Sequence, residues 1–201
     1  DAGKHTLTIS TAQPATGNNH SIRVHQETGT IIFQNMDIVH GGGQMLLRLG
    51  EDAYTEATEK VLTVKMSNMD IKSTSTYKWC LMATYDLGQF DIEMTNVDVD
   101  WDRTEATSGG AFLRCGNGSK GQTVNLTTNG CTINLADTKD AQGMNILAKV
   151  SGTFDLNDTD IITSGASTYT NSGSVPGILR RHKLRYSRKL FSHAPAPLAV
   201  L

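Results

Sequence analysis

Long apolar runs are absent from this chain of 201 residues, and aromatic residues are few. No apolar run approaches the ~18 residues that a membrane-spanning helix needs, so we expect no membrane span. Phe, Trp and Tyr together make up 6% of the sequence, which disfavours a surface that stacks single-stranded nucleic acid on aromatic rings. No glycine-rich loop follows a strand pattern and opens a helix, so nucleotide chemistry is not expected either.

Cysteine is also scarce, and its pattern excludes two classes of site. Cys80, Cys115 and Cys131 form neither a complete disulfide framework nor a metal-binding motif. We therefore expect all three to be buried as small apolar residues. Charge is nearly balanced, with 18 Lys and Arg against 20 Asp and Glu, so the total indicates no class of partner. The chain starts at Asp1 with neither Met nor a signal peptide, which we interpret as a processed or trimmed product.

What the chain does contain is a repeated sequence motif. An alternating strand pattern runs into an Asn, one residue follows, and an Asp with a β-branched residue opens a second strand, as in Val61–Ile71 and again in Phe90–Val99. The Asn recurs at spacings of 33, 28, 33 and 28 residues, at Asn35, Asn68, Asn96, Asn129 and Asn157. The last two copies carry one extra residue after the Asn. Asn tolerates left-handed backbone geometry at a tight corner, so we predict a structural ladder of stacked Asn side chains.

A second sequence motif, an apolar strand that ends at a Gly, alternates with the first. It reads Gly43–Gly50 and Gly110–Gly116. Each period of about 30 residues then holds three short strands, which is what one coil of a solenoid requires. A coil cannot bury its own apolar face, whereas stacked coils build parallel sheets around one core. The sequence thus predicts an all-β parallel β-solenoid of six to seven coils with three strands per coil.

The motif [IV]-x-[MLF]-x-N-x-D-[IV], repeated about every 30 residues, resembles the repeats of the right-handed parallel β-helix in the pectate-lyase-like superfamily. The pieces Gly109–Phe112 and Phe154–Asn157 are also similar to the short repeats of chlamydial polymorphic outer-membrane proteins. The β-helix resemblance covers about residues 30 to 165 and implies the right-handed fold. It leaves function open, because lyases, hydrolases, adhesins and phage tailspikes share this scaffold.

The repeats divide the chain into three parts. Residues 1–29 hold two alternating runs and are expected to form an irregular entry coil that caps the N-terminal end of the helix. Residues 30–173 hold the β-helix repeats. Residues 174–201 form a tail with six Lys or Arg between positions 180 and 189. This tail is interpreted either as a basic segment for an anionic surface or as a C-terminal cap, a disordered tail or non-native residues.

Strand alternation places a row of acidic residues on the outer surface. After the Asn, the outward positions are Asp37, Asp70, Asp98, Thr132 and Asp160, and adjacent coils bring neighbours to roughly 5 Å. Asp100 and Asp102 extend this row beside Asp98. Such oxygen ligands would suit calcium, so Asp98, Asp100 and Asp102 are the candidate metal site, with no other cofactor expected. The alternative is a solvated acidic surface that blocks non-specific association.

The strand before the Gly offers the opposite charge. Arg48 and Arg114 align there, Lys149 falls at the same place, and Thr84 or Asp86 occupies the intervening coil. In pectate-lyase-like enzymes this sheet commonly carries the substrate groove, so the resemblance implies that Arg48, Arg114 and Lys149 bind glycan. Their alternative role is simply to keep an exposed β surface hydrated.

Neither ladder makes a catalytic set by itself. The two lie on different sheets, and a hydrolase needs two or three carboxylates in one cleft. Trp101 is expected to face the core and His40 to be a surface residue without a nucleophile beside it. We therefore expect a secreted or cell-surface β-helix module that binds a polysaccharide or cell-surface glycan, or that has a structural or adhesive role. The alternatives are a polysaccharide lyase or glycoside hydrolase acting on acidic polysaccharide, and a phage tailspike-like fragment, which would be a trimer.

Overall fold

The computed structural model describes a chain built from strands and their corners. The described residues are 3–9, 20–24, 28–42, 44–50, 61–75, 80–85, 88–101, 111–116, 122–135, 142–146, 150–163, 170–171 and 183–186. Among them there is no helix, so the described part of the chain is all-β, as the sequence predicts. None of these residues forms a helix that could cross a membrane.

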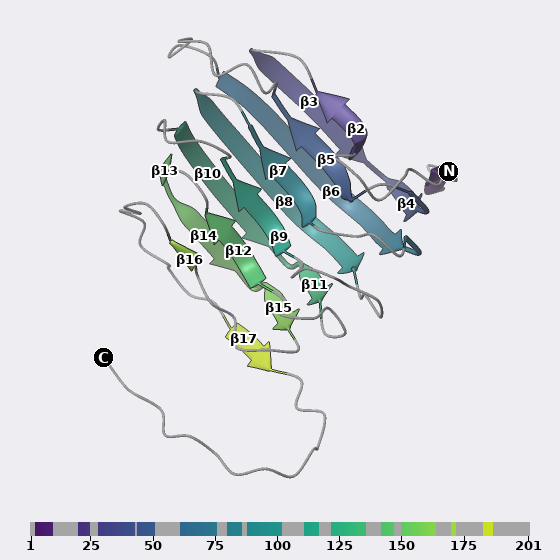
Figure 1. Ribbon diagram of the computed structural model, residues 1–201. Coiled ribbons are helices and arrows are strands. Elements are labelled where there is room, and N and C mark those ends of the chain that lie inside the picture. Colours follow the sequence, from purple (N-terminus) through teal and green to yellow (C-terminus); the bar gives the residue numbers. More distant parts are fainter. Residues whose placement is uncertain are drawn as a thin grey trace.

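The strands form two parallel sheets. The larger sheet contains β1 (His5–Ile9), β3 (Gly29–Gln34), β4 (Met36–His40), β6 (Val61–Ser73), β8 (Gln89–Asp100), β10 (Gln122–Asn129), β11 (Thr132–Leu135), β13 (Val150–Ser151), β14 (Phe154–Asn157), β15 (Asp160–Thr163) and β17 (Lys183–Tyr186). The smaller sheet contains β2 (His20–Val24), β5 (Met45–Leu49), β7 (Cys80–Thr84), β9 (Ala111–Cys115), β12 (Gln142–Ile146) and β16 (Thr170–Asn171). Figure 1 shows the strands stacked from purple β2 and β3 at one end to yellow β17 at the other.

This arrangement is a parallel β-solenoid, because each strand pairs with its counterpart about one repeat away. For example, β6 pairs with β8 from Val61 opposite Gln89 to Lys72 opposite Asp100. The fully paired centre consists of about three turns, β5–β6, β7–β8 and β9–β10–β11, against the six to seven coils predicted. The strands on either side of the Asn corner belong to one bent sheet, and in β6 and β8 they run through the corner without a break.

The Asn corners explain that bend. Asn35, Asn68 and Asn96 have φ angles of 51°, 52° and 52°, in the left-handed region that Asn tolerates better than most residues. Their side chains stack: Asn68 Nδ2 donates to Asn35 Oδ1 at 3.1 Å, and Asn96 Nδ2 donates to Asn68 Oδ1 at 3.4 Å. In the two later copies the extra residue takes the left-handed position, with Gly130 at 61° and Asp158 at 44°. Asn129 and Asn157 instead end β10 and β14 side by side.

The core lies between the two sheets and follows strand alternation. In β6 the inward side chains Leu62, Val64, Met66, Met69 and Ile71 are all at most 3% exposed. Their counterparts in β8, β10 and β11 are similarly buried, so each column of the core is continuous from coil to coil. Cys80, Cys115 and Cys131 are free and buried, as expected from their scarcity.

Both ends of the chain contribute strands to the solenoid. In the entry segment, β1 pairs with β4 and β2 pairs with β5, so residues before position 30 extend both sheets. In the basic tail, β17 pairs with β15 and places Lys183 opposite Asp160. The rest of the tail, including residues 187–201, lies outside the described residues.

Candidate functional site

A continuous polar surface covers the outer side of the larger sheet before the Asn corner. Alternation along β6, β8, β10 and β14 points every second side chain outward. In register these side chains form three columns, which together we call the polar face: Thr63, Asp91 and Asn125; Lys65, Glu93, Thr127 and Asp155; Ser67, Thr95, Asn129 and Asn157. The polar face therefore offers hydroxyl, amide and carboxylate groups at the ~4.8 Å spacing of adjacent strands.

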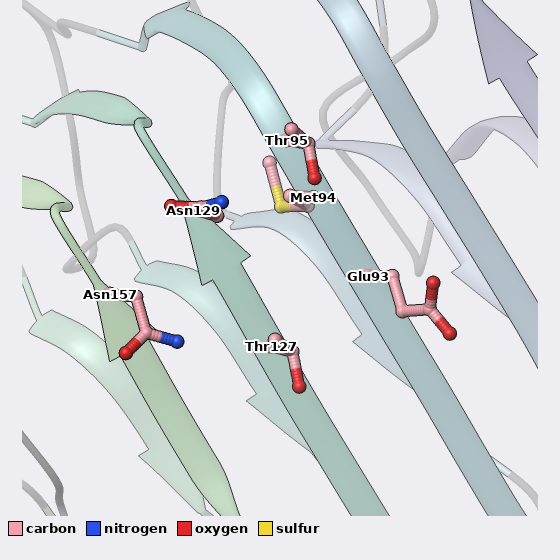
Figure 2. A pocket seen from close by; sticks show the side chains of 6 residues that line it. All are labelled: Glu93, Met94, Thr95, Thr127, Asn129 and Asn157. Atoms are coloured by element: carbon pink, nitrogen blue, oxygen red, sulfur yellow. The ribbon is translucent and has the colours of Figure 1, made fainter.

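An open groove of about 520 Å³ lies on this polar face. It is lined by Glu93, Met94, Thr95, Thr127, Asn129 and Asn157, which come from the three successive strands β8, β10 and β14 (Figure 2). Met94 is 1% exposed, so the groups that the groove presents to a ligand are the polar ones. Figure 2 shows Glu93 and Thr127 on neighbouring strands, with the amides of Asn129 and Asn157 side by side at the strand ends.

Hydrogen bonds hold one border of the polar face in place. Asn125 Nδ2 donates to Asp91 Oδ1 at 2.8 Å, and Gln89 Nε2 donates to both carboxylate oxygens of Asp91 at 2.9 Å. The other amide atom of Asn125, Oδ1, accepts the backbone N–H of Thr153 at 3.1 Å. Because these groups fix one another, the border is preorganised rather than free to rearrange around a ligand.

The polar face carries net negative charge. Its carboxylates are Asp91, Glu93 and Asp155, and the cation among its columns is Lys65. Lys65 Nζ lies 2.8 Å from Glu93 Oε2, with both side chains about half exposed. An exposed pair of this kind contributes little to stability.

The acidic ladder predicted beyond the Asn corner is present in register. Asp37, Asp70, Asp98, Thr132 and Asp160 occupy one column of β4, β6, β8, β11 and β15. Lys4 Nζ lies 2.8 Å from Asp70 Oδ2 and 3.5 Å from Asp37 Oδ1. The hydrogen bond to Asp70 raises the pKa of Lys4 above its ordinary value. The N-terminal end of the ladder is therefore compensated by a lysine.

The candidate calcium residues lie at the middle of this ladder. Asp98 and Asp100 line a shallow depression together with Asp70, Lys72, Thr132 and Asn134. Lys72 stands opposite Asp100, and Asn134 Nδ2 donates to Asp100 Oδ1 at 3.5 Å. Within the part of the chain that the structure describes, no three His, Cys, Asp or Glu side chains converge as metal ligands would. Asp102 lies outside the described residues, so calcium at Asp98, Asp100 and Asp102 stays a prediction.

The two arginines of the basic ladder are buried, whereas the sequence predicted an exposed row. Arg48 and Arg114 share a column of the smaller sheet, but Ala83 stands between them in place of Thr84 or Asp86. The next position in the column is Asn145, while Lys149 lies outside the described residues. Arg48 and Arg114 are only 3% and 8% exposed, which leaves a polysaccharide little guanidinium surface to contact.

These arginines belong to a buried cluster on the smaller sheet. The guanidinium carbon of Arg48 lies 4.2 Å from the centre of the Tyr85 ring, a cation–π geometry. Tyr85 packs with Met45, Cys80, Ala83 and Ala111, and its hydroxyl donates to Met45 Sδ at 3.6 Å. Burial raises the pKa of Tyr85, and the hydrogen bond with Arg114 acts in the opposite direction. The two arginines therefore lie beside a small buried cluster that is separate from the main core cluster.

His40 is buried, so the surface position expected for it is wrong. Its side chain is fully enclosed, its Nδ1 lies 2.9 Å from Ser73 Oγ, and its ring stacks on Trp101 at 4.9 Å. Ser73 is 3% exposed, so this His–Ser pair is closed to a polymeric substrate. Trp101 is fully buried, which confirms its predicted place in the core.

Sequence reasoning missed the groove residues Glu93 and Thr127 and their neighbour Asp155. The signal was available: the alternation that identified Asp98 also makes Glu93 outward, and the repeat aligns Glu93 with Thr127 and Asp155. Comparisons of the chain with protein-family models, curated proteins and solved structures gave no match. What this protein does must therefore be argued from its own surface.

Proposed function

We propose that this chain is a glycan-binding β-solenoid module, secreted or displayed on a cell surface, and that the polar face is its binding site. The observation on which the proposal depends is the open groove across β8, β10 and β14. Its polar lining consists of a carboxylate, two hydroxyls and two amides. These are the groups that donate hydrogen bonds to sugar hydroxyls and accept hydrogen bonds from them.

The regular spacing of the solenoid supports a polymeric ligand. Equivalent positions recur at about 4.8 Å along the stack, so a chain lying across the strands meets similar groups at each step. An extended sugar polymer also repeats its hydroxyls along its length. The resemblance to pectate-lyase-like proteins also favours a glycan ligand. We place the binding site on the polar face, because Arg48 and Arg114, to which the resemblance pointed, are buried.

Binding to immobilised oligosaccharides tests the proposal. The double change Asn129→Ala and Asn157→Ala removes two amides from the groove and should weaken binding about thirtyfold, because each lost hydrogen bond is worth about 1 kcal/mol and every 1.4 kcal/mol is tenfold in affinity. Lys72→Ala is the matched control, since Lys72 is exposed beyond the Asn corner and does not line the groove. Equal loss in the control, or no binding to any glycan by the unchanged protein, would refute the assignment.

A hydrolase is the second candidate, and one observation favours it. Glu93 and Asp155 share a column with Thr127 between them, which sets their Cα atoms about 10 Å apart, two strand spacings. Inverting glycosidases hold their two carboxyl groups about 6.5–9.5 Å apart, within reach of such side chains. Shortening of a bound polysaccharide that is lost in Glu93→Gln would establish hydrolysis. Binding without shortening, with or without calcium, would leave the binding module.

A lyase and a tailspike-like fragment would each give a distinct readout. A lyase would leave unsaturated uronate ends on its products, and a tailspike-like fragment would form a trimer. Product analysis by absorbance and solution mass by sedimentation distinguish both from a monomeric binding module.

A further inference from the structure

We infer that the groove selects uncharged polysaccharides and rejects acidic ones. This inference rests on the proposed function and names the ligand class of the same site. It departs from the uronate-type ligand that the resemblance suggests. The reason is the charge of the polar face, which is set by four described side chains.

Negative charge exceeds positive charge on the polar face. Asp91, Glu93 and Asp155 contribute three negative charges to the polar face, and Lys65 contributes one positive charge. Lys65 is already paired with Glu93 at 2.8 Å. A uronate chain in the groove would bring further carboxylates within roughly 5–10 Å of Asp155 and Asp91, where like charges repel even after screening by salt.

The groove is lined mainly by neutral polar groups. Thr95, Thr127, Asn129 and Asn157 present neutral hydroxyls and amides, while the Glu93 carboxylate accepts hydrogen bonds from hydroxyl groups. Sugar hydroxyls satisfy these groups without a counter-charge. A carboxylate ligand instead needs arginine or lysine donors, whereas Arg48 and Arg114 are buried in the smaller sheet.

Two further lysines of the larger sheet's outer surface do not serve the groove. Lys4 and Lys72 lie beyond the Asn corner, where Lys4 is bonded to Asp70 and Lys72 stands opposite Asp100. Neither lines the groove. Apart from Lys65, whose charge is offset by Glu93, the described residues around the groove supply acceptors and neutral donors, which suit an uncharged polyhydroxylated chain.

The test compares two panels of oligosaccharides of equal length by biolayer interferometry. The uncharged panel consists of cello-, manno- and xylo-oligosaccharides, and the acidic panel of oligogalacturonate and oligomannuronate. The unchanged protein should bind at least one uncharged probe about tenfold more tightly than any acidic probe at low salt, with the gap narrowing as salt rises.

A charge-removing variant sharpens the test. Glu93→Gln with Asp155→Asn keeps the shape of the groove and removes two charges, so affinity for the acidic probes should rise about threefold to tenfold. Because Glu93 lines the groove, the change also alters binding of the uncharged probe, so the readout is the ratio of acidic to uncharged affinity, which should rise. Asp98→Asn is the matched control, because it removes a charge from β8 beyond the Asn corner and should change neither panel.

The outcomes separate the two proposals. Tighter binding of an acidic probe by the unchanged protein would overturn the inference while leaving glycan binding in place. An equal gain in Asp98→Asn would also overturn it, because the effect would then come from total charge. Binding to no probe in either panel would contradict the proposed function and the inference together.

Discussion

At the scale of single residues, the left-handed corners are the positions where identity matters most. Asn68 has a φ of 52° and is bonded to Asn35 and Asn96 through its side-chain amide. Asn68→Ala should lower the free energy of unfolding by about 1–2 kcal/mol, because a β-carbon without a polar group disfavours this conformation. Asn68→Gly should cost less, since glycine restores the backbone but not the amide bonds. Urea denaturation midpoints measure both.

Asn129 provides the control for that prediction. It occupies a similar place in the repeat, but its neighbour Gly130 takes the positive φ of 61°. Asn129→Ala should therefore leave the denaturation midpoint nearly unchanged. If Asn68→Ala and Asn129→Ala cost the same, the backbone geometry of the corner is not what the Asn residues stabilise.

The buried thiols make a prediction about alkaline pH. Burial raises the pKa of Cys80 and of Cys115 to about 12 from an ordinary value of 9.0. Between these values the native state holds protons that the unfolded state releases, so the free energy of unfolding falls as pH rises from about 9 to about 12. The full loss is at most about 4 kcal/mol per thiol.

Urea unfolding at about pH 8 and about pH 10.5 measures this loss, and Cys115→Ala should show a shallower decline than the unchanged protein. The same burial should keep the thiols unreactive toward Ellman's reagent until the chain unfolds. Rapid thiol labelling of the native protein, or an identical pH slope in Cys115→Ala, would contradict the burial described.

At the scale of elements, Gly152 sets how β13 and β14 join the sheet. It has a φ of 125°, and an added Cβ would contact the backbone carbonyl of Val124 in β10. Gly152→Ala should therefore destabilise the fold by several kcal/mol, since both the backbone conformation and the strand spacing oppose it. Gly3→Ala is the control, because nothing lies within 4 Å of a Cβ there. Thermal unfolding of the two variants gives the comparison. Equal melting temperatures would contradict the close contact between residue 152 and the Val124 carbonyl.

Elements also show how far the sequence could predict this structure. Alternation and the recurring Asn were enough for the parallel solenoid, its register beyond the corner and its buried cysteines, because each depends on local periodicity. The burial of Arg48 was not foreseen, although the runs Met45–Leu49 and Ala111–Cys115 are apolar on both faces. Such runs are typical of a sheet covered on both sides. The single arginine in each run nevertheless led to the prediction that this surface is exposed. His40 was misplaced although Ser73 is its counterpart one repeat away, because the repeat pattern did not show that the Trp101 ring covers the imidazole.

At the scale of the whole molecule, the solenoid has an apolar edge at its N-terminal end. Among the described residues, β3 pairs only with β6, and its other edge has no strand beside it. Ile32 in β3 is 58% exposed, the highest value among the exposed large apolar side chains of the described residues. The inward residues Ile31 and Phe33 are only partly buried, whereas Val64 and Met66, one coil further in, are 0% and 3% exposed. The core is therefore less completely covered at this end.

An open strand edge with an exposed apolar residue favours edge-to-edge association, which a charge opposes. Ile32→Lys should therefore reduce self-association in sedimentation velocity. The free energy of unfolding should fall by no more than about 1 kcal/mol, because the side chain is exposed but the new lysine stands opposite Lys65. Val61→Lys is the matched control, since Val61 is 36% exposed but lies on β6, which has paired strands on both sides. An equal effect of the two changes would assign the association to exposed apolar area alone. An effect confined to Ile32→Lys would assign it to the β3 edge.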